Sequence, residues 1–234
     1  KIFTANHIMK SVFPLENCKK GEKRFLRIIF YLTRTLPGKL VNKFIEMSFP
    51  ITVDAMDISA KYYSVPQNKM KIIPLGVDTQ LFKPPVTDEL KIIRDRKRKD
   101  FGLEEDDILC IYTGRFSEGK NPLCLAKAIN KLVDNGEKYK GLFIGDGKQL
   151  EEIRKLKGCI IINFVLFNEL ADLYLIGDIG VWPREESTSM LDAAASGLPL
   201  IISNTVQATE RIKDIGYTYH ENNNDDLADT LLKL

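Results

Sequence analysis

The chain has 234 residues, 44% of them hydrophobic and 28% charged, and carries a formal net charge of +2. This balance is typical of a folded globular protein and excludes a disordered or fibrous chain. No apolar run reaches the roughly 18 residues of a membrane span, and the start at Lys1 shows neither an initiator Met nor a signal peptide, so we expect a fragment of a longer protein.

The cysteines and histidines argue against a metal centre. The four cysteines form no Cys-x-x-Cys pair, and Cys110, Cys124 and Cys159 lie in apolar runs where a reduced thiol packs as a small hydrophobe. This usage predicts a cytoplasmic, reducing compartment. Because His7 and His220 are the only histidines, we expect no zinc or other bound metal.

Basic charge and helical periodicity mark the first part of the chain. Residues 1–50 carry ten Lys and Arg against three Asp and Glu. Over 23–49, apolar residues recur at helical spacing among basic ones, and Pro37-Gly38 is expected to divide the segment into two helices. Two interpretations stay open. The segment is either a basic amphipathic face in peripheral contact with an anionic membrane surface at the inner face, or an apolar stripe facing the core of a small α/β domain.

A segment rich in Pro and Gly follows, at 71–85, and is typical of a crossing between domains. We therefore place an N-terminal part at 1–70 and a C-terminal domain at 71–234. Residues 86–102 are predicted to be helical. Their basic run is interpreted as a solvated helix face rather than a nucleic-acid or lipid contact, because no aromatic residues interleave it and acids flank it.

From Ile108 onward, apolar strands alternate with helical stretches, which predicts a parallel α/β sheet with helices on both faces. We expect strands near 108–113, 141–145, 160–164, 178–182 and 199–203. We expect helices near 122–135, 148–157, 168–176, 189–196 and 224–233. The ligand of such a sheet lies beyond the carboxyl ends of its strands. Three loops converge there: Gly114-Arg115, Gly145-Asp146-Gly147 and Pro183-Arg184-Glu185-Glu186.

The first of these loops sets two cations around a turn between a strand and a helix. Arg115 follows Gly114, and Lys120 stands just before Asn121-Pro122, a dipeptide typical of an N-cap and a first helical position. A helix N-terminus and two cations that face one spot would hold a diphosphate. The alternative is an ordinary turn with two solvated charges.

The loop and helix over 183–197 suggest a second half of the same site. Its small residues let the helix pack close to the sheet, its acids can accept hydrogen bonds from sugar and ribose hydroxyls, and free amides near Ser187 can take a phosphate. The alternative for Ser189-x-x-Asp192 is a variant of the capping box, in which Asp192 serves only the helix start.

Together these features resemble the group 1, or family 4, glycosyltransferases of GT-B fold. The resemblance runs from Ile58 to Leu234, and the early acceptor-side strands of that family have no counterpart here. It rests on motifs in a fixed order: Ile58-Ser59, Ile73-Pro74-Leu75-Gly76-Val77-Asp78, Gly114-Arg115 with Lys120, Phe143-Ile144-Gly145-Asp146-Gly147, and Leu191-Asp192-Ala193 with Gly197-x-Pro199.

The resemblance implies an α/β architecture with a Rossmann-like donor domain and part of a second Rossmann-like domain. Its donor would be a UDP-sugar or GDP-sugar, with no other cofactor. Arg115 and Lys120 would neutralise the diphosphate leaving group, and the 164–167 segment would meet the base. The donor-binding positions it implies are Gly114, Gly145, Asp146, Gly147, Val165, Leu170, Ser187, Thr188, Ser189 and Asp192.

The acidic pair departs from the family pattern. Family members carry two Glu separated by seven residues, the second on the ribose and the first near the donor sugar. Asp192 takes the second position with a shorter side chain, and Arg184 occupies the spacing of the first. Either Glu185 or Glu186 is expected to replace it. His7 resembles a strand-end histidine near the acceptor cleft, although such a residue is more often an ordinary surface histidine.

The resulting expectation is a hexosyltransferase that acts on a glycan or lipid-linked acceptor, retaining and metal-independent, with no nucleic-acid partner. Two alternatives stay open. One is another sugar-nucleotide enzyme of this fold, such as an epimerase or a phosphorylase. The other is a non-catalytic paralogue or isolated donor domain that only binds nucleotide sugar.

Overall fold

The computed structural model describes residues 2–6, 13, 15, 23–206 and 214–234, which fall into two compact units, Lys1–Gly76 and Val77–Leu234. The predicted boundary at 70/71 lies six residues earlier. The difference arises because Lys71 and Ile73 still donate backbone hydrogen bonds to Ser48 and Pro50 of the first unit. His7 lies outside the described residues.

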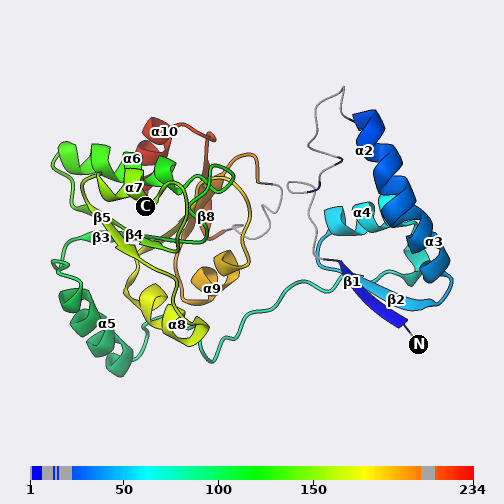
Figure 1. Cartoon of the computed structure of the whole chain (residues 1–234). Coiled ribbons are helices and arrows are strands. Elements are labelled where there is room, and N and C mark those ends of the chain that lie inside the picture. Colours follow the sequence, from blue (N-terminus) through cyan, green and yellow to red (C-terminus); the bar gives the residue numbers. More distant parts are fainter. Residues whose placement is uncertain (1, 7–12, 14, 16–22, 207–213) are drawn as a thin grey trace. The chain divides into compact units, whose positions relative to one another are not determined.

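The first unit contains two parallel strands with helices packed beside them (Figure 1). Its elements are β1 (Ile2–Asn6), α2 (Lys23–Phe30), a π-helical turn (Tyr31–Thr35), α3 (Leu36–Asn42), β2 (Ile45–Pro50), α4 (Val53–Tyr63) and a 3-10 turn (Gln67–Lys69). Phe13 packs against Phe30 and Tyr62 with ring centroids 5.3 and 4.6 Å apart. This aromatic cluster holds α2 against α4.

The expected break at Pro37-Gly38 is wrong, because the helix continues through it. Pro37 is the second residue of α3, directly after the π-helical turn. In a π-helical turn the backbone hydrogen bonds join residues i and i+5 rather than i and i+4. A proline that follows it, which has no N–H to donate and carries a bulky ring, therefore does not break the helix. The helix ends at Asn42 instead. Of the apolar residues expected on this helix, Phe44 lies just before β2 and Met47 lies within it.

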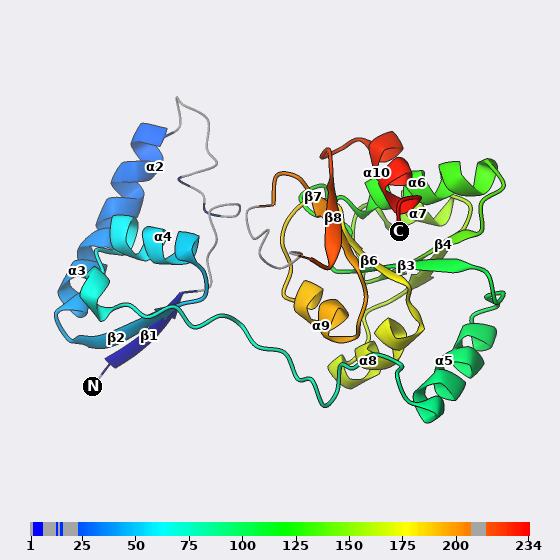
Figure 2. The same cartoon turned by 180° about the vertical axis from the view of Figure 1, so that it is seen from behind.

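The second unit is a six-stranded parallel sheet in the order β5-β4-β3-β6-β7-β8. In Figures 1 and 2, α6, α7 and α10 cover one face of this sheet, and α5, α8 and α9 cover the other. The elements are α5 (Asp88–Asp100), β3 (Ile108–Thr113), α6 (Pro122–Asp134), β4 (Tyr139–Ile144), α7 (Leu150–Arg154), β5 (Cys159–Ile162), α8 (Phe167–Ile176), β6 (Ile179–Trp182), α9 (Ser189–Ala195), β7 (Leu200–Ser203), β8 (Gly216–Tyr219) and α10 (Asn224–Leu231).

The predicted α/β class is confirmed, and strands buried on both faces explain why the sequence shows continuous apolar runs there. In β3 and β4 nearly every side chain is buried. β3 and β6 are neighbours in the sheet although β4 and β5 lie between them in sequence. From this pair, the earlier strands are added toward one edge of the sheet and the later strands toward the other. A crevice beyond the carboxyl ends is expected at this switch point.

The basic run on α5 is not simply solvated, which corrects that expectation. Arg94 and Arg98 turn inward and bind Asp178, at 2.5 and 2.9 Å from its two carboxylate oxygens. They also donate to main-chain carbonyls at the end of α8, Arg94 to Leu175 at 2.6 Å and Arg98 to Ile176 at 2.9 Å. Two arginines on one helix therefore fasten α5 to the sheet. They also supply hydrogen-bond donors to the carbonyl groups at the C-terminus of α8.

Candidate functional site

A cavity of about 410 Å³ lies beyond the ends of β3, β4 and β5, beside the start of α9. Its lining includes both apolar and polar side chains. Its lining residues are Thr113, Gly114, Arg115, Ile144, Gly145, Asp146, Phe164, Val165, Leu170, Ser187 and Ser189. Most of the predicted donor-binding residues therefore meet in one cavity. Gly147, Thr188, Asp192, Lys120, Glu185 and Glu186 do not line it.

Glycine is required where the β3 and β4 loops touch. Gly145 has φ +144°, and a Cβ built on it would lie 2.0 Å from the carbonyl oxygen of Gly114. At Gly147, with φ +150°, a Cβ would lie 2.5 Å from the carbonyl oxygen of Phe116. Neither position accepts a side chain without moving backbone. The two loops are thus pressed together to form the floor of the cavity.

A buried tyrosine on α8 anchors two edges of the cavity at once. The Tyr174 hydroxyl donates to the carbonyl of Ser189 at 3.2 Å and lies 2.6 Å from the Thr113 hydroxyl. Trp182 adds a hydrogen bond from its indole N–H to the Thr113 carbonyl at 3.3 Å. Sequence reasoning missed these residues, because their aromatic and apolar setting resembles ordinary core. They position the Gly114-Arg115 turn against the start of α9.

Replacing Tyr174 by Phe removes this shared anchor. We expect a loss of about 1–3 kcal/mol in unfolding free energy, because the Thr113 hydroxyl and Ser189 carbonyl lose their partner. We also expect weaker binding of nucleoside diphosphate, measured by calorimetry beside urea unfolding. Tyr139→Phe is the matched control, since its buried hydroxyl donates to Leu231 at 3.1 Å, outside the cavity lining. Equal nucleotide affinity in both variants would contradict the anchoring role.

The two predicted cations have different environments. Arg115 is exposed, lines the cavity and makes no ion pair with any described residue. Lys120 is mostly buried, lies 3.5 Å from a Glu185 carboxylate oxygen and donates to the Glu186 carbonyl at 2.5 Å. Burial lowers the pKa of Lys120, Glu185 opposes this effect, and the nearby Arg115 guanidinium lowers it further. The cations lie close enough to repel each other, and a bound anion would relieve that repulsion.

The start of α6 does not supply the expected cap. Asn121 adopts a left-handed conformation with φ +50°, and its side chain donates to Asn222 rather than capping the helix. Pro122 is the first helical residue, as predicted. The amide of Leu123 donates to the side chain of Gln149 at 3.4 Å. One amide of this helix N-terminus therefore has a protein partner.

The acidic loop is tied to its neighbours. Arg184, at the family spacing of the first acid, lies 3.1 Å from a Glu221 carboxylate oxygen and donates to the Glu118 carbonyl. Glu185 stands over Gly119, whose missing side chain leaves room for the carboxylate to reach Lys120. Glu186 is buried, with 6% of its surface exposed. The loop is thus held by ion pairs on both sides.

Asp192 does not act as a helix cap. Thr188 is the N-cap of α9 and makes no side-chain cap bond, whereas Asp192 lies in the first turn, half-buried. Its carboxyl has no hydrogen-bond or ion-pair partner among the described residues. Burial raises the pKa of Asp192 above its usual range. An ionised carboxyl kept partly dry without a partner is typical of a site that awaits a ligand.

Asp192→Asn is therefore expected to stabilise the fold slightly at neutral pH while it weakens nucleotide binding. The folded protein holds the Asp192 proton more tightly than the unfolded chain, so its stabilising contribution is present at low pH and lost as the pH rises through the raised pKa. At pH values above that pKa, the unfolding free energy of the variant should exceed that of the unaltered protein by less than about 1 kcal/mol, because solvent screens the half-buried charge. The gain should shrink as the pH falls toward about 4.

Thermal unfolding of both proteins between pH 4 and 8 measures this effect. Asp95→Asn removes an exposed acid on α5 and serves as the control. A stability difference that stays constant over this range would show that burial of the Asp192 charge does not set it.

Comparison with known proteins places this cavity in a family. A family profile described as Glycosyl transferases group 1 matches residues 107–234, more than half of the chain. A UDP-Gal:alpha-D-GlcNAc-diphosphoundecaprenol alpha-1,3-galactosyltransferase of Escherichia coli is 27% identical over 160 residues, covering 63% of this chain and 40% of that protein. A GDP-mannose-dependent alpha-(1-6)-phosphatidylinositol monomannoside mannosyltransferase of Mycobacterium tuberculosis is also 27% identical, with 63% and 41% covered.

Among solved structures, Anabaena Alr3699/HepE in complex with UDP superimposes with a TM-score of 0.74 at 13% identity, covering 99% of this chain and 61% of that one. The chain spans about two fifths of the length of the two curated relatives described above. The α/β fold of GT-B glycosyltransferases is thereby confirmed. Because the family profile matches more than half of its residues, the chain belongs to the group 1 glycosyltransferases.

Proposed function

We propose that this protein transfers a hexose-type sugar from a UDP-sugar or GDP-sugar to a glycan or lipid-linked acceptor. The reaction proceeds with retention at the anomeric carbon and needs neither a metal nor a cofactor. The single observation that carries the proposal is the mixed lining of the cavity, in which the apolar Ile144, Val165 and Leu170 occur together with Arg115 and two serines. A nucleotide likewise combines an apolar base with an anionic tail.

The chemistry follows from the charges. Negative charge builds on the departing diphosphate as the sugar becomes oxocarbenium-like, and fixed cations at that place lower the barrier. Arg115 presents a planar fork and Lys120 a point charge held by Glu185 and Glu186. Asp192 would accept hydrogen bonds from the ribose hydroxyls, and the acidic loop with Glu185 and Glu186 would face the donor sugar. In this arrangement the leaving group binds without a metal.

Relatives support the donor class. The names of the two curated relatives include UDP-Gal and GDP-mannose, and the neighbouring solved structure contains UDP. Both relatives' names also include a lipid-linked acceptor. We extend the donor class and the acceptor class to this protein as part of the proposal.

Calorimetry and thermal shift with UDP, GDP, ADP and their sugar conjugates test the donor site. We expect one base to stabilise the protein selectively and Arg115→Ala to abolish that effect. No response to any nucleotide would overturn the proposal. With the preferred donor, NMR of the product's anomeric proton tests retention, and unchanged turnover in chelator tests metal independence.

The second candidate is a protein that binds nucleotide sugar without turning it over. It is favoured by the acidic pair, in which Arg184 replaces the first acid and Asp192 the second. The two functions differ in a turnover assay on the full-length gene product, because a binding protein shows donor affinity without acceptor-dependent release of nucleoside diphosphate.

We also infer peripheral contact with an anionic membrane on the cytoplasmic side. The segment Lys23–Asn42 leaves apolar residues exposed beside basic ones, and it attaches to α4 partly through polar Thr35 and Asn42. The exposed apolar residues are Phe25, Leu26, Ile28, Ile29, Leu32, Leu36, Leu40 and Val41. No helix in the described ranges has the length and apolar character needed to cross a bilayer. Salt-sensitive co-flotation with anionic liposomes is expected, and its absence would overturn the contact.

A further inference from the structure

The first unit contains a cavity with an unusually basic lining. It has a volume of about 450 Å³ and lies between the long helical segment and α4. Its lining residues are Leu15, Arg27, Phe30, Tyr31, Thr35, Lys39, Lys61, Tyr62 and Ser64. Three of these are cations, and no acidic side chain of the described residues lines the cavity.

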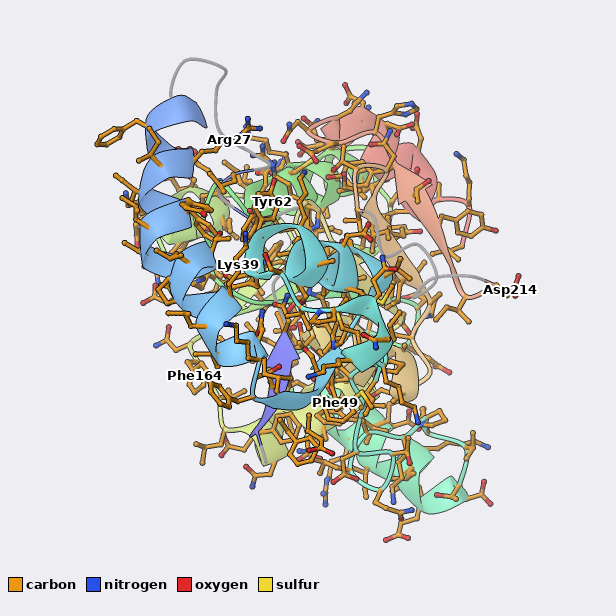
Figure 3. All side chains as sticks on the ribbon, turned by 90° about the vertical axis from the view of Figure 1, so that its right-hand side faces the viewer. Arg27, Lys39, Phe49, Tyr62, Phe164 and Asp214 are labelled. Carbon is orange, nitrogen blue, oxygen red and sulfur yellow. The ribbon has the colours of Figure 1, made fainter. Side chains whose placement is uncertain are left out.

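The π-helical turn creates this arrangement. Arg27, Tyr31, Thr35 and Lys39 are spaced by four residues, and in a regular α-helix each such step overshoots a full turn by about 40°, so the four would drift around the axis. The turn Tyr31–Thr35 takes more residues per turn and cancels part of that drift. All four then line one cavity. In Figure 3, Arg27, Tyr62 and Lys39 lie one below another between the long helix and α4.

Two of the three cations in this cavity lie over aromatic rings. Lys39 Nζ lies 5.7 Å from the centroid of the Tyr31 ring, and Lys61 Nζ lies 4.8 Å from that of Tyr62. Arg27 and Lys39 form no ion pair with any described residue. A cation–π contact at an exposed site is weaker than a charge-assisted hydrogen bond to phosphate. A phosphate group that enters would therefore draw Lys39 toward itself, and Arg27 could donate to the same group.

The neighbouring surface indicates what carries the phosphate. The exposed apolar residues of the same helix, such as Ile28, Leu32 and Leu36, lie along the segment that forms the cavity wall. An anionic group beside an apolar surface matches the headgroup and acyl region of a phospholipid. A soluble phosphate ester would use the cations but leave the apolar surface in water.

We propose that this cavity binds the phosphate of a membrane phospholipid headgroup, through Arg27, Lys39 and Lys61 beside Tyr31 and Tyr62. The proposal rests on the membrane contact inferred above and makes it specific, because it replaces general attraction between a basic face and a charged surface by a defined site. Its effect is to fix the rotation of the helix on the bilayer.

The test compares two double variants of the whole chain that remove the same charge from the same helical segment. Arg27→Gln with Lys39→Gln empties the cavity of two cations. Arg34→Gln with Lys43→Gln removes two exposed cations that do not line it. Binding is measured by co-sedimentation with vesicles of phosphatidylcholine containing phosphatidylglycerol, and far-UV circular dichroism confirms that each variant folds.

We expect the cavity variant to lose about tenfold more affinity for these vesicles than the control variant, because it loses direct phosphate contacts as well as charge. Equal losses would overturn the site and leave the membrane contact standing. Failure of the unaltered protein to bind would overturn both. A parallel titration with glycerol 1-phosphate distinguishes the source, since saturable binding of the soluble ester by a protein that ignores vesicles would also overturn the lipid assignment.

Discussion

Arg115→Ala is expected to lower donor turnover by roughly 100- to 1000-fold without unfolding the protein. The loss corresponds to about 2.7–4 kcal/mol of barrier, as for removal of one electrostatic donor at a developing anion. The side chain is exposed and makes no ion pair among the described residues, so the fold should keep its stability. Steady-state kinetics with the preferred nucleotide sugar, alongside thermal unfolding, measure both effects.

Arg154→Ala is the matched control, because that arginine is also exposed and pairs only with Glu151 on its own helix. Near-normal turnover by the Arg115 variant would refute the assignment of the diphosphate site. Lys120→Ala should show a similar catalytic loss together with a loss of stability. It removes the partner of Glu185 and a hydrogen bond to the Glu186 carbonyl.

Asp178→Asn should destabilise the second unit by about 3–5 kcal/mol, since two largely buried guanidinium groups lose their counter-charge. The side chains of Arg94 and Arg98 are only 18% and 9% exposed. Asp178 also accepts the main-chain amide of Leu109 at 2.7 Å, at the start of the central strand. For a unit of this size the melting temperature should fall by roughly 6–20 °C.

Asp172→Asn provides the control at the same helix pair. Asp172 binds Lys97 at 2.9 Å across α5 and α8, but it is 54% exposed, and an exposed pair contributes at most about 1 kcal/mol. Chemical denaturation of the two variants should therefore give clearly different midpoints. Similar midpoints would mean that the arginine cluster is not what fastens α5.

Most of the second unit was predictable from its sequence, because parallel strands buried on both faces appear as short apolar runs separated by turn residues. β3 has the predicted bounds, the ends of β4 to β7 differ from the predicted ones by at most two residues, and β8 was not among the five predicted strands. The first unit was harder. The sequence predicted two helices divided at Pro37, whereas the structure has a helix that continues through this residue after a π-helical turn, because a π turn leaves no local sequence signature.

For the cavity, the glycines and Arg115 were found from sequence because their roles are local: a positive φ, a close backbone approach, a charge at the end of a strand. Tyr174 was not found. Its hydroxyl meets Thr113 across 61 residues, and nothing near either residue in the sequence marks the pair. Phe164 lines the cavity and is 85% exposed, which only the structure shows.

The sequence by itself determined the order of most strands and helices and the edge of the sheet at which the predicted loops meet, because both depend on periodicity and turn residues within short windows; the resemblance of its motifs to known proteins indicated the family. The tertiary structure decided which cation is free and which is held. Lys120 reaches the Glu186 carbonyl across 66 residues, and Arg94 reaches Asp178 across 84. Such pairs form only when separate βα units pack side by side, so their partners depend on the packed sheet and not on the spacing of residues along the chain.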